Sequence, residues 1–329
     1  MDLTLGDGVG VPMRWLNRHA LITGATGTGK TVTLRSIAGQ LARAGSTVLV
    51  MDAKGDISGR KVAPVFDLFT LGPDLICRAL ELSEAQSGAV FVLYAMAEKE
   101  GQRLASLADL RALCTLAAGR LDWVSATHGL VGKATLAAVQ RAALRLQHDA
   151  GAAFGRPGLD LGQLGPGLNV MPCQTLARNP AAYGAAAAHV LTNLYNRAPE
   201  VGDIARPKWA VVIDEAHLVF SDCPPPVVRR LESVVRLIRS KGVALIFATQ
   251  SPADIPPGIS GQLATRVQHG LRAVTPGQLR DVRAAAESLP GGTIEAIQGL
   301  GIGDALVSVP GAGGVPGLCQ RIRSARVFP

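Results

Sequence analysis

A glycine-rich segment near the amino end carries the first residues that could do chemistry. Residues 24–31 match the pattern G-x-x-x-x-G-K-[ST], follow an apolar run from Ala20, and precede residues 32–44, whose apolar spacing predicts a helix. Only a glycine-rich turn lets consecutive backbone N–H groups close around a polyphosphate, and the positive end of the following helix reinforces that anion site. Because every motif position is met between a strand and a helix, the segment predicts a P-loop rather than an ordinary glycine turn.

The P-loop residues have separable expected roles. Lys30 supplies a point charge to the β and γ phosphates, and the Thr31 hydroxyl is placed to ligate Mg²⁺. The expected ligands are therefore ATP and Mg²⁺. The predicted nucleotide-binding residues are Gly24, Ala25, Thr26, Gly27, Thr28, Gly29, Lys30, Thr31 and Val32.

A second apolar run ends in two neighbouring acids. Residues 209–213 are followed by Asp214 and Glu215, which is the hhhhDE pattern of a Walker B strand. We expect Asp214 to hold the Mg²⁺ through water, and Glu215 to orient and polarise the attacking water as the general base. An apolar strand that ends in two acids is common, and the P-loop upstream gives this one its meaning.

Two further strands end in polar residues that belong to the same expected site. The run at residues 46–51 ends in Asp52, and strand–helix–strand spacing from the P-loop predicts a βαβ unit with ligands at the carboxyl ends of its strands. Asp52 is therefore a possible additional acidic site residue. The run at residues 242–248 leads to Gln250, which could hydrogen-bond both the γ phosphate and the lytic water. This sensor role is preferred over a turn glutamine because the strand directly follows the Walker B pattern.

A helix expected from Pro224 to Ser240 ends close to the sensor strand. Its last turn carries Arg239, where a neighbouring subunit's phosphates could be reached. The predicted catalytic set is thus Lys30, Glu215, Arg239 and Gln250.

The order of the elements predicts an α/β fold with a mainly parallel sheet flanked by helices. Residues 1–71 and 165–329 are expected to form the core, and residues 72–164 a helical insertion. Within the insertion, residues 80–99, 104–119 and 134–148 have helical spacing of apolar positions.

Composition excludes several other classes of protein. The chain has 329 residues, 48% of them hydrophobic, and no apolar run approaches the roughly 20 residues of a membrane helix. The amino end lacks a secretory signal pattern, so a cytoplasmic location without membrane contact is expected. The five cysteines are scattered, which indicates neither a disulfide framework nor a zinc site. A net charge of +8 is compatible with a polyanionic partner.

Taken together, the motifs resemble those of bacterial HerA-like ATPases of the YjgR type, within the HerA/FtsK superfamily. The resemblance implies a RecA-like core with the sensor strand between the Walker A and Walker B strands. It also implies a ring, usually a hexamer, with ATP at subunit junctions and Arg239 at the position of the trans-acting arginine finger. The P-loop begins too early for the β-barrel with which HerA proper docks its nuclease, so a nuclease partner stays open. The segments that carry the resemblance are residues 16–31, 52–56, 214–218, 236–242, 248–252 and 266–273.

Three functions are compatible with these patterns. The leading hypothesis is an Mg²⁺-dependent ring ATPase that translocates along or pumps double-stranded DNA, using phosphate contacts that ignore sequence. A second is a secretion- or conjugation-type motor that acts on protein. A third is a monomeric nucleotide-dependent switch or kinase.

Overall fold

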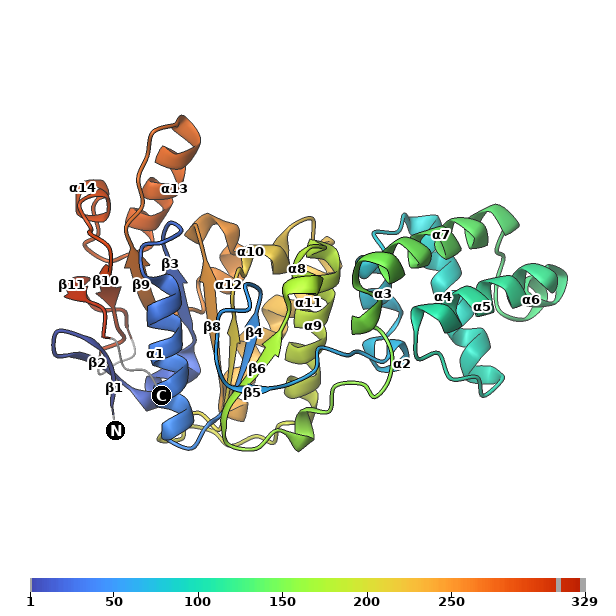
Figure 1. Cartoon of the computed structure of the whole chain (residues 1–329), viewed down its shortest axis with the longest axis horizontal. Helices are drawn as coiled ribbons and strands as arrows, with labels where there is room; N and C mark the ends of the chain where they lie inside the picture. Colours follow the sequence, from blue (N-terminus) through green and yellow to red (C-terminus); the bar gives the residue numbers. More distant parts are fainter. Residues whose placement is uncertain (1, 312–314, 326–329) are drawn as a thin grey trace.

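One extended sheet forms the centre of the molecule (Figure 1). The computed structural model describes residues 2–311 and 315–325, and within them nine strands form this sheet in the order β11-β10-β9-β3-β8-β7-β4-β6-β5. The seven strands from β9 to β5 in that order are parallel, whereas β10 runs antiparallel to both of its neighbours. Their bounds are β3 Ala20–Thr23, β4 Thr47–Asp52, β5 Arg60–Lys61, β6 Gly167–Pro172, β7 Trp209–Ile213, β8 Val243–Thr249, β9 Thr265–His269, β10 Asp304–Ser308 and β11 Gln320–Arg323.

The central strands are continuous apolar runs because both faces of the sheet are covered. In β4, Leu49 and Met51 belong to the hydrophobic core on one face, while Val48 and Val50 belong to the core on the other. All four side chains are fully buried. The expected α/β class with a mainly parallel sheet is therefore confirmed.

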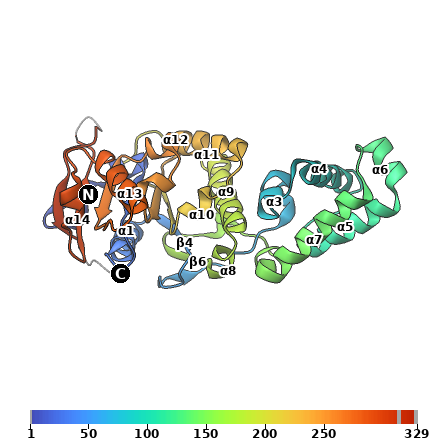
Figure 2. The same ribbon diagram turned by 90° about the horizontal axis from the view of Figure 1, so that it is seen from above.

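The two faces are covered by different elements. Helix α1, Lys30–Arg43, lies on one face together with the hairpin of β1, Asp2–Gly6, and β2, Val9–Pro12. Helices α9, Pro180–Arg197, and α11, Pro225–Leu237, cover the other face. In Figure 2, α1 lies on one side of the sheet and α11 on the opposite side.

A group of helices extends from one end of the sheet, far from α1 (Figures 1 and 2). The three predicted helices in this region are present as α4, α5 and α7, and α3 and α6 are additional. Apolar positions on α5 and α7, such as Leu110 and Val139, are buried in the same core as α9. The bounds are α2 Leu68–Leu71, α3 Pro73–Ala79, α4 Glu84–Lys99, α5 Leu107–Gly119, α6 Leu121–Thr127 and α7 Lys133–Ala150.

The remaining elements are short, apart from one helix near the carboxyl end. None of the helices within the described ranges is both long and apolar enough to cross a bilayer. The α-helices are α8 Gln174–Ala177, α10 His217–Phe220, α12 Pro257–Ser260, α13 Pro276–Glu287 and α14 Ile294–Gln298. The 3₁₀ helices are η1 Met13–Arg18, η2 Gly151–Ala153, η3 Leu161–Gln163, η4 Ile238–Lys241 and η5 Pro252–Asp254.

Candidate active site

Strand order gathers the predicted site residues at one edge of the sheet. Strands β3, β8, β7 and β4 are consecutive neighbours and all parallel, so their carboxyl ends meet at that edge. These ends lead into the P-loop, Gln250, the acid pair Asp214 and Glu215, and Asp52. The order also confirms that the strand before Gln250 lies between the two Walker strands.

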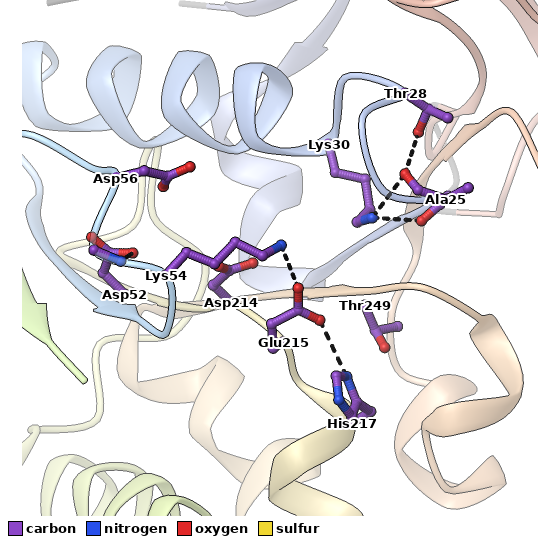
Figure 3. A network of polar contacts seen from close by, with 12 residues as sticks. Ala25, Thr28, Lys30, Asp52, Lys54, Asp56, Asp214, Glu215, His217 and Thr249 are labelled. Carbon is purple, nitrogen blue, oxygen red and sulfur yellow. Dashed lines mark hydrogen bonds and ion pairs between the residues drawn. The ribbon is translucent and has the colours of Figure 1, made fainter. Parts of the chain in front are cut away.

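Lys30 lies at the start of α1 and is turned back onto the P-loop. Its Nζ donates hydrogen bonds to the carbonyl oxygens of Gly24, at 2.5 Å, and Ala25, at 3.1 Å. Burial lowers the pKa of Lys30 and nearby Lys54 lowers it further, while Glu215 and Asp214 act in the opposite direction. The charges of Lys30, Asp214 and Glu215 therefore act on one another. Figure 3 shows the side chains of Lys30 and Glu215 in the same part of the site.

The P-loop backbone is held by three neighbouring segments. The Gly24 N–H donates to the Gln250 carbonyl at 3.3 Å, and the Ala25 N–H donates to the Gly270 carbonyl at 3.0 Å. On the far side of the loop, the Gly303 N–H donates to the Thr28 carbonyl at 2.9 Å. Between these anchors, residues 26–27 form the exposed tip of the loop.

His269, at the end of β9, packs against the P-loop at Gly24 and Gly29. Its Nδ1 lies 3.0 Å from the Asp304 carbonyl, which can only accept, so Nδ1 carries the proton and Nε2 accepts the Thr33 hydroxyl at 2.9 Å. Gly24 has a φ of +145°, and a Cβ there would lie 2.5 Å from the His269 Cβ, so only glycine allows this approach. Burial lowers the pKa of His269 to about 4, and the imidazole is therefore neutral at pH 7.

Asp214 is a buried acid with an unused oxygen. Its Oδ2 is buried and has no hydrogen-bond partner among the described residues. Burial raises the pKa of Asp214 to about 6, although the Lys54 ammonium acts in the opposite direction. The backbone is fixed from below, because the Tyr183 hydroxyl donates to the Asp214 carbonyl at 2.6 Å. The Asp214 backbone is thus held in place, and its side-chain Oδ2 can still accept a hydrogen bond or a metal ion.

Glu215 contacts two basic side chains in the arrangement of Figure 3. Its Oε1 forms an ion pair with Lys54, and its Oε2 lies 3.3 Å from the His217 Nδ1. Contact with His217, then with Lys54, lowers the pKa of Glu215 to about 2 despite burial. The residue also has a φ of +50°, a conformation that costs a non-glycine residue free energy and is found at functional sites. Glu215 is therefore ionised, and its contacts with Lys54 and His217 restrict the rotation of its side chain.

Asp52 shapes the loop that carries Lys54. Its two carboxylate oxygens accept the backbone N–H groups of Gly55, at 2.8 Å, and Ile57, at 3.0 Å. The side chain is fully buried at the predicted edge. Lys54 and His217 lie within segments that carry the family resemblance, but the sequence predicts no role for either residue, since only their approach to Glu215 reveals one.

Gln250 and Arg239 lie at opposite ends of β8. Gln250 is exposed beside Gly24, whereas Arg239 lies in η4, before the strand begins. A seven-residue strand separates the two ends by roughly 20 Å, so Arg239 is remote from the P-loop of its own chain. The Arg239 Nη2 lies 3.6 Å from Oδ1 of Asp203, whose side chain is 94% exposed.

A glycine-rich turn between a strand and a helix, with an acid pair on a nearby parallel strand, defines the chain as a P-loop NTPase with a RecA-type fold. The family model "Helicase HerA-like C-terminal" matches residues 2–68 and 64–327. The protein belongs to this HerA-like family. No curated protein sequence matches the chain.

Solved structures with a similar fold include a bacterial conjugative coupling protein and VirB4. The bacterial conjugative coupling protein TrwBdeltaN70, in an unbound form, has a TM-score of 0.69 at 15% identity, covering 100% of this chain and 89% of that one. TrwB in complex with ADP and Mg²⁺ has a TM-score of 0.66 at 15% identity, covering 97% and 87%. VirB4 of Thermoanaerobacter pseudethanolicus has a TM-score of 0.67 at 16% identity, covering 98% and 95%.

Proposed function

We propose that the protein is an Mg²⁺-dependent ATPase that assembles into a ring, usually a hexamer, and moves double-stranded DNA. The observation that carries this proposal is the meeting of the P-loop with Asp214 and Glu215 at one sheet edge. Membership of the HerA-like family and the net charge of +8 also support it.

The residues at the edge fit ATP and Mg²⁺. The Oδ2 of Asp214 is a buried acceptor without a partner, and carboxylate and hydroxyl oxygens are the ligands that Mg²⁺ prefers. Asp214, through water, and the Thr31 hydroxyl would hold the ion, which when bound supplies positive charge against the phosphates. The related TrwB structure in complex with ADP and Mg²⁺ supports this assignment.

The protein's own side chains have distinct parts in hydrolysis. Lys30 exchanges its two P-loop carbonyl acceptors for phosphate oxygens, because charged acceptors form the stronger hydrogen bonds. Glu215 orients the attacking water and takes its proton, while Gln250 hydrogen-bonds that water and the γ phosphate. Backbone N–H groups of residues 24–32 surround the phosphates.

The position of Arg239 supports hydrolysis between subunits. Because this residue lies at the amino end of β8, it serves the P-loop of a neighbour rather than that of its own chain. Residues 1–71 and 165–329 form the ATPase core in this proposal. Residues 72–164 form a helical insertion, which agrees with the absence of sheet strands between Lys61 and Gly167 in the described structure.

ATPase rate against protein concentration, with and without duplex DNA, tests this function. We expect the specific activity to rise with concentration as rings assemble and to rise again on addition of DNA. DNA that neither binds at low salt nor stimulates hydrolysis would refute the DNA motor. Full turnover in dilute monomer, unaffected by Arg239→Ala, would indicate a switch instead.

A further inference from the structure

Lys54 brings a second lysine to the site, one that the proposed mechanism does not use. Its ammonium pairs with Glu215 and also interacts with the charge of Asp214, which lies next to it in the chain. Figure 3 shows the Lys54 side chain extended across Asp214 towards Glu215. One lysine thus spans both acids of the Walker B strand.

When Asp214 and Glu215 are both ionised, a nearby positive charge is needed to stabilise them. Asp214 is 3% exposed and Glu215 is 8% exposed, and two neighbouring carboxylates in such surroundings repel each other. Removal of a buried charge's partner is strongly destabilising. Lys54 supplies one such partner and His217 supplies another for Glu215, and the Asp52 carboxylate fixes the loop from which Lys54 reaches across.

The same acids would face Mg²⁺ when nucleotide is bound. Two cations beside one acid pair repel each other, so the ion and the ammonium compete for this place. Lys54 is able to leave, because its side chain is 36% exposed and its charge also interacts with Asp56 on the same loop, a carboxylate that pairs with Arg35 as well. Asp214 and Glu215, in contrast, are fixed by burial.

We propose that Lys54 is a positioning residue that neutralises Asp214 and Glu215 as a tethered cation until metal-bound nucleotide displaces it, which frees Glu215 for the attacking water. This inference rests on the proposed function for its role in turnover. Lys54 thereby determines when Glu215 can contact the attacking water. Without metal-bound nucleotide, Glu215 stays paired with Lys54.

Metal affinity tests the competition without any turnover. Mn²⁺ binding is measured by electron paramagnetic resonance, both with Mn²⁺ alone and with ADP, for the wild-type protein and the Lys54→Met and Lys54→Gln variants. We expect the Mn²⁺ Kd to fall about tenfold in both variants, equivalent to the loss of ~1.4 kcal/mol of repulsion. Lys54→Arg, which keeps the charge, should match the wild type.

Two controls separate this effect from a general change of charge or of folding. Lys99→Met removes the same charge from the exposed end of α4 and should leave the Kd unchanged. In a Glu215→Gln background, Lys54→Met should change the Kd by less than it does alone, because part of the competition is gone. Lys54→Gln retains polarity and hydrogen bonding if the methionine variant folds poorly.

The outcomes distinguish this inference from the proposed function. An Mn²⁺ Kd that is unchanged or raised in the Lys54 variants overturns the competition, even in a protein that hydrolyses ATP normally. A lowered Kd for Mn²⁺ alone in a protein that never hydrolyses ATP supports the competition and refutes the proposed function.

Discussion

Replacement of His269 by alanine should both destabilise the protein and loosen its P-loop. The substitution removes the acceptor of the Thr33 hydroxyl and the donor to the Asp304 carbonyl, and each lost hydrogen bond costs about 0.5–1.5 kcal/mol. The emptied space beside Gly24 and Gly29 adds a cavity cost. We expect the free energy of unfolding to fall by about 2–4 kcal/mol in total.

The effect on nucleotide binding should exceed what lost stability explains. Under conditions where His269→Ala is still folded, the Kd for a fluorescent ADP analogue should rise about tenfold, because the loop no longer rests on a fixed support. His148→Ala, on the exposed face of α7, is the matched control. Urea unfolding gives the first quantity and fluorescence titration the second. A stability loss below about 0.5 kcal/mol with an unchanged Kd would refute the role of His269 in supporting the P-loop.

Three further predictions concern catalysis and pH. Glu215→Gln should retain ATP binding and lower kcat by about 10²-fold or more, and rapid hydrolysis by this variant would refute the general-base assignment. Arg239→Ala should lower kcat by about 10³-fold without changing the assembled mass measured by light scattering, whereas Arg236→Ala on the exposed face of α11 should not. The free energy of unfolding should fall as pH decreases from 7 towards 4, because buried histidines whose folded pKa is below the unfolded value favour the unfolded, protonated chain. Asp214, with its raised pKa, opposes this trend below pH 6, and a flat urea-unfolding profile over that range would contradict the prediction. The buried histidines, each with a pKa of about 4, are His19, His189 and His269.

The sequence predicts those parts of the site that depend on local order along the chain. A glycine-rich turn, an apolar run and the residue that follows it are all contiguous, so the P-loop, the acid pair and the edge position of Gln250 could be predicted. The parallel sheet follows from the same contiguous patterns, since buried strands contain unbroken apolar runs.

The supporting residues could not be predicted, since they act across long separations in the chain. His269 reaches Thr33 from the end of β9, and Lys54 meets Glu215 from a loop after β4. Nothing in either local pattern specifies such a partner. Residues 266–273 carry the family resemblance, but the sequence predicts no role for His269, and only its close approach to Gly24 explains it.

The bond between Gly303 and the P-loop has a consequence for how the protein is made. The ribosome synthesises a chain from its amino end, so residues 24–31 emerge long before the segment that contains Gly303 and β10. Until that segment packs against the loop, the Gly303–Thr28 hydrogen bond is missing, and so is the Asp304 carbonyl that fixes the His269 tautomer. A nascent chain therefore cannot complete the support of its nucleotide pocket until the segment around Gly303 and Asp304 has also emerged.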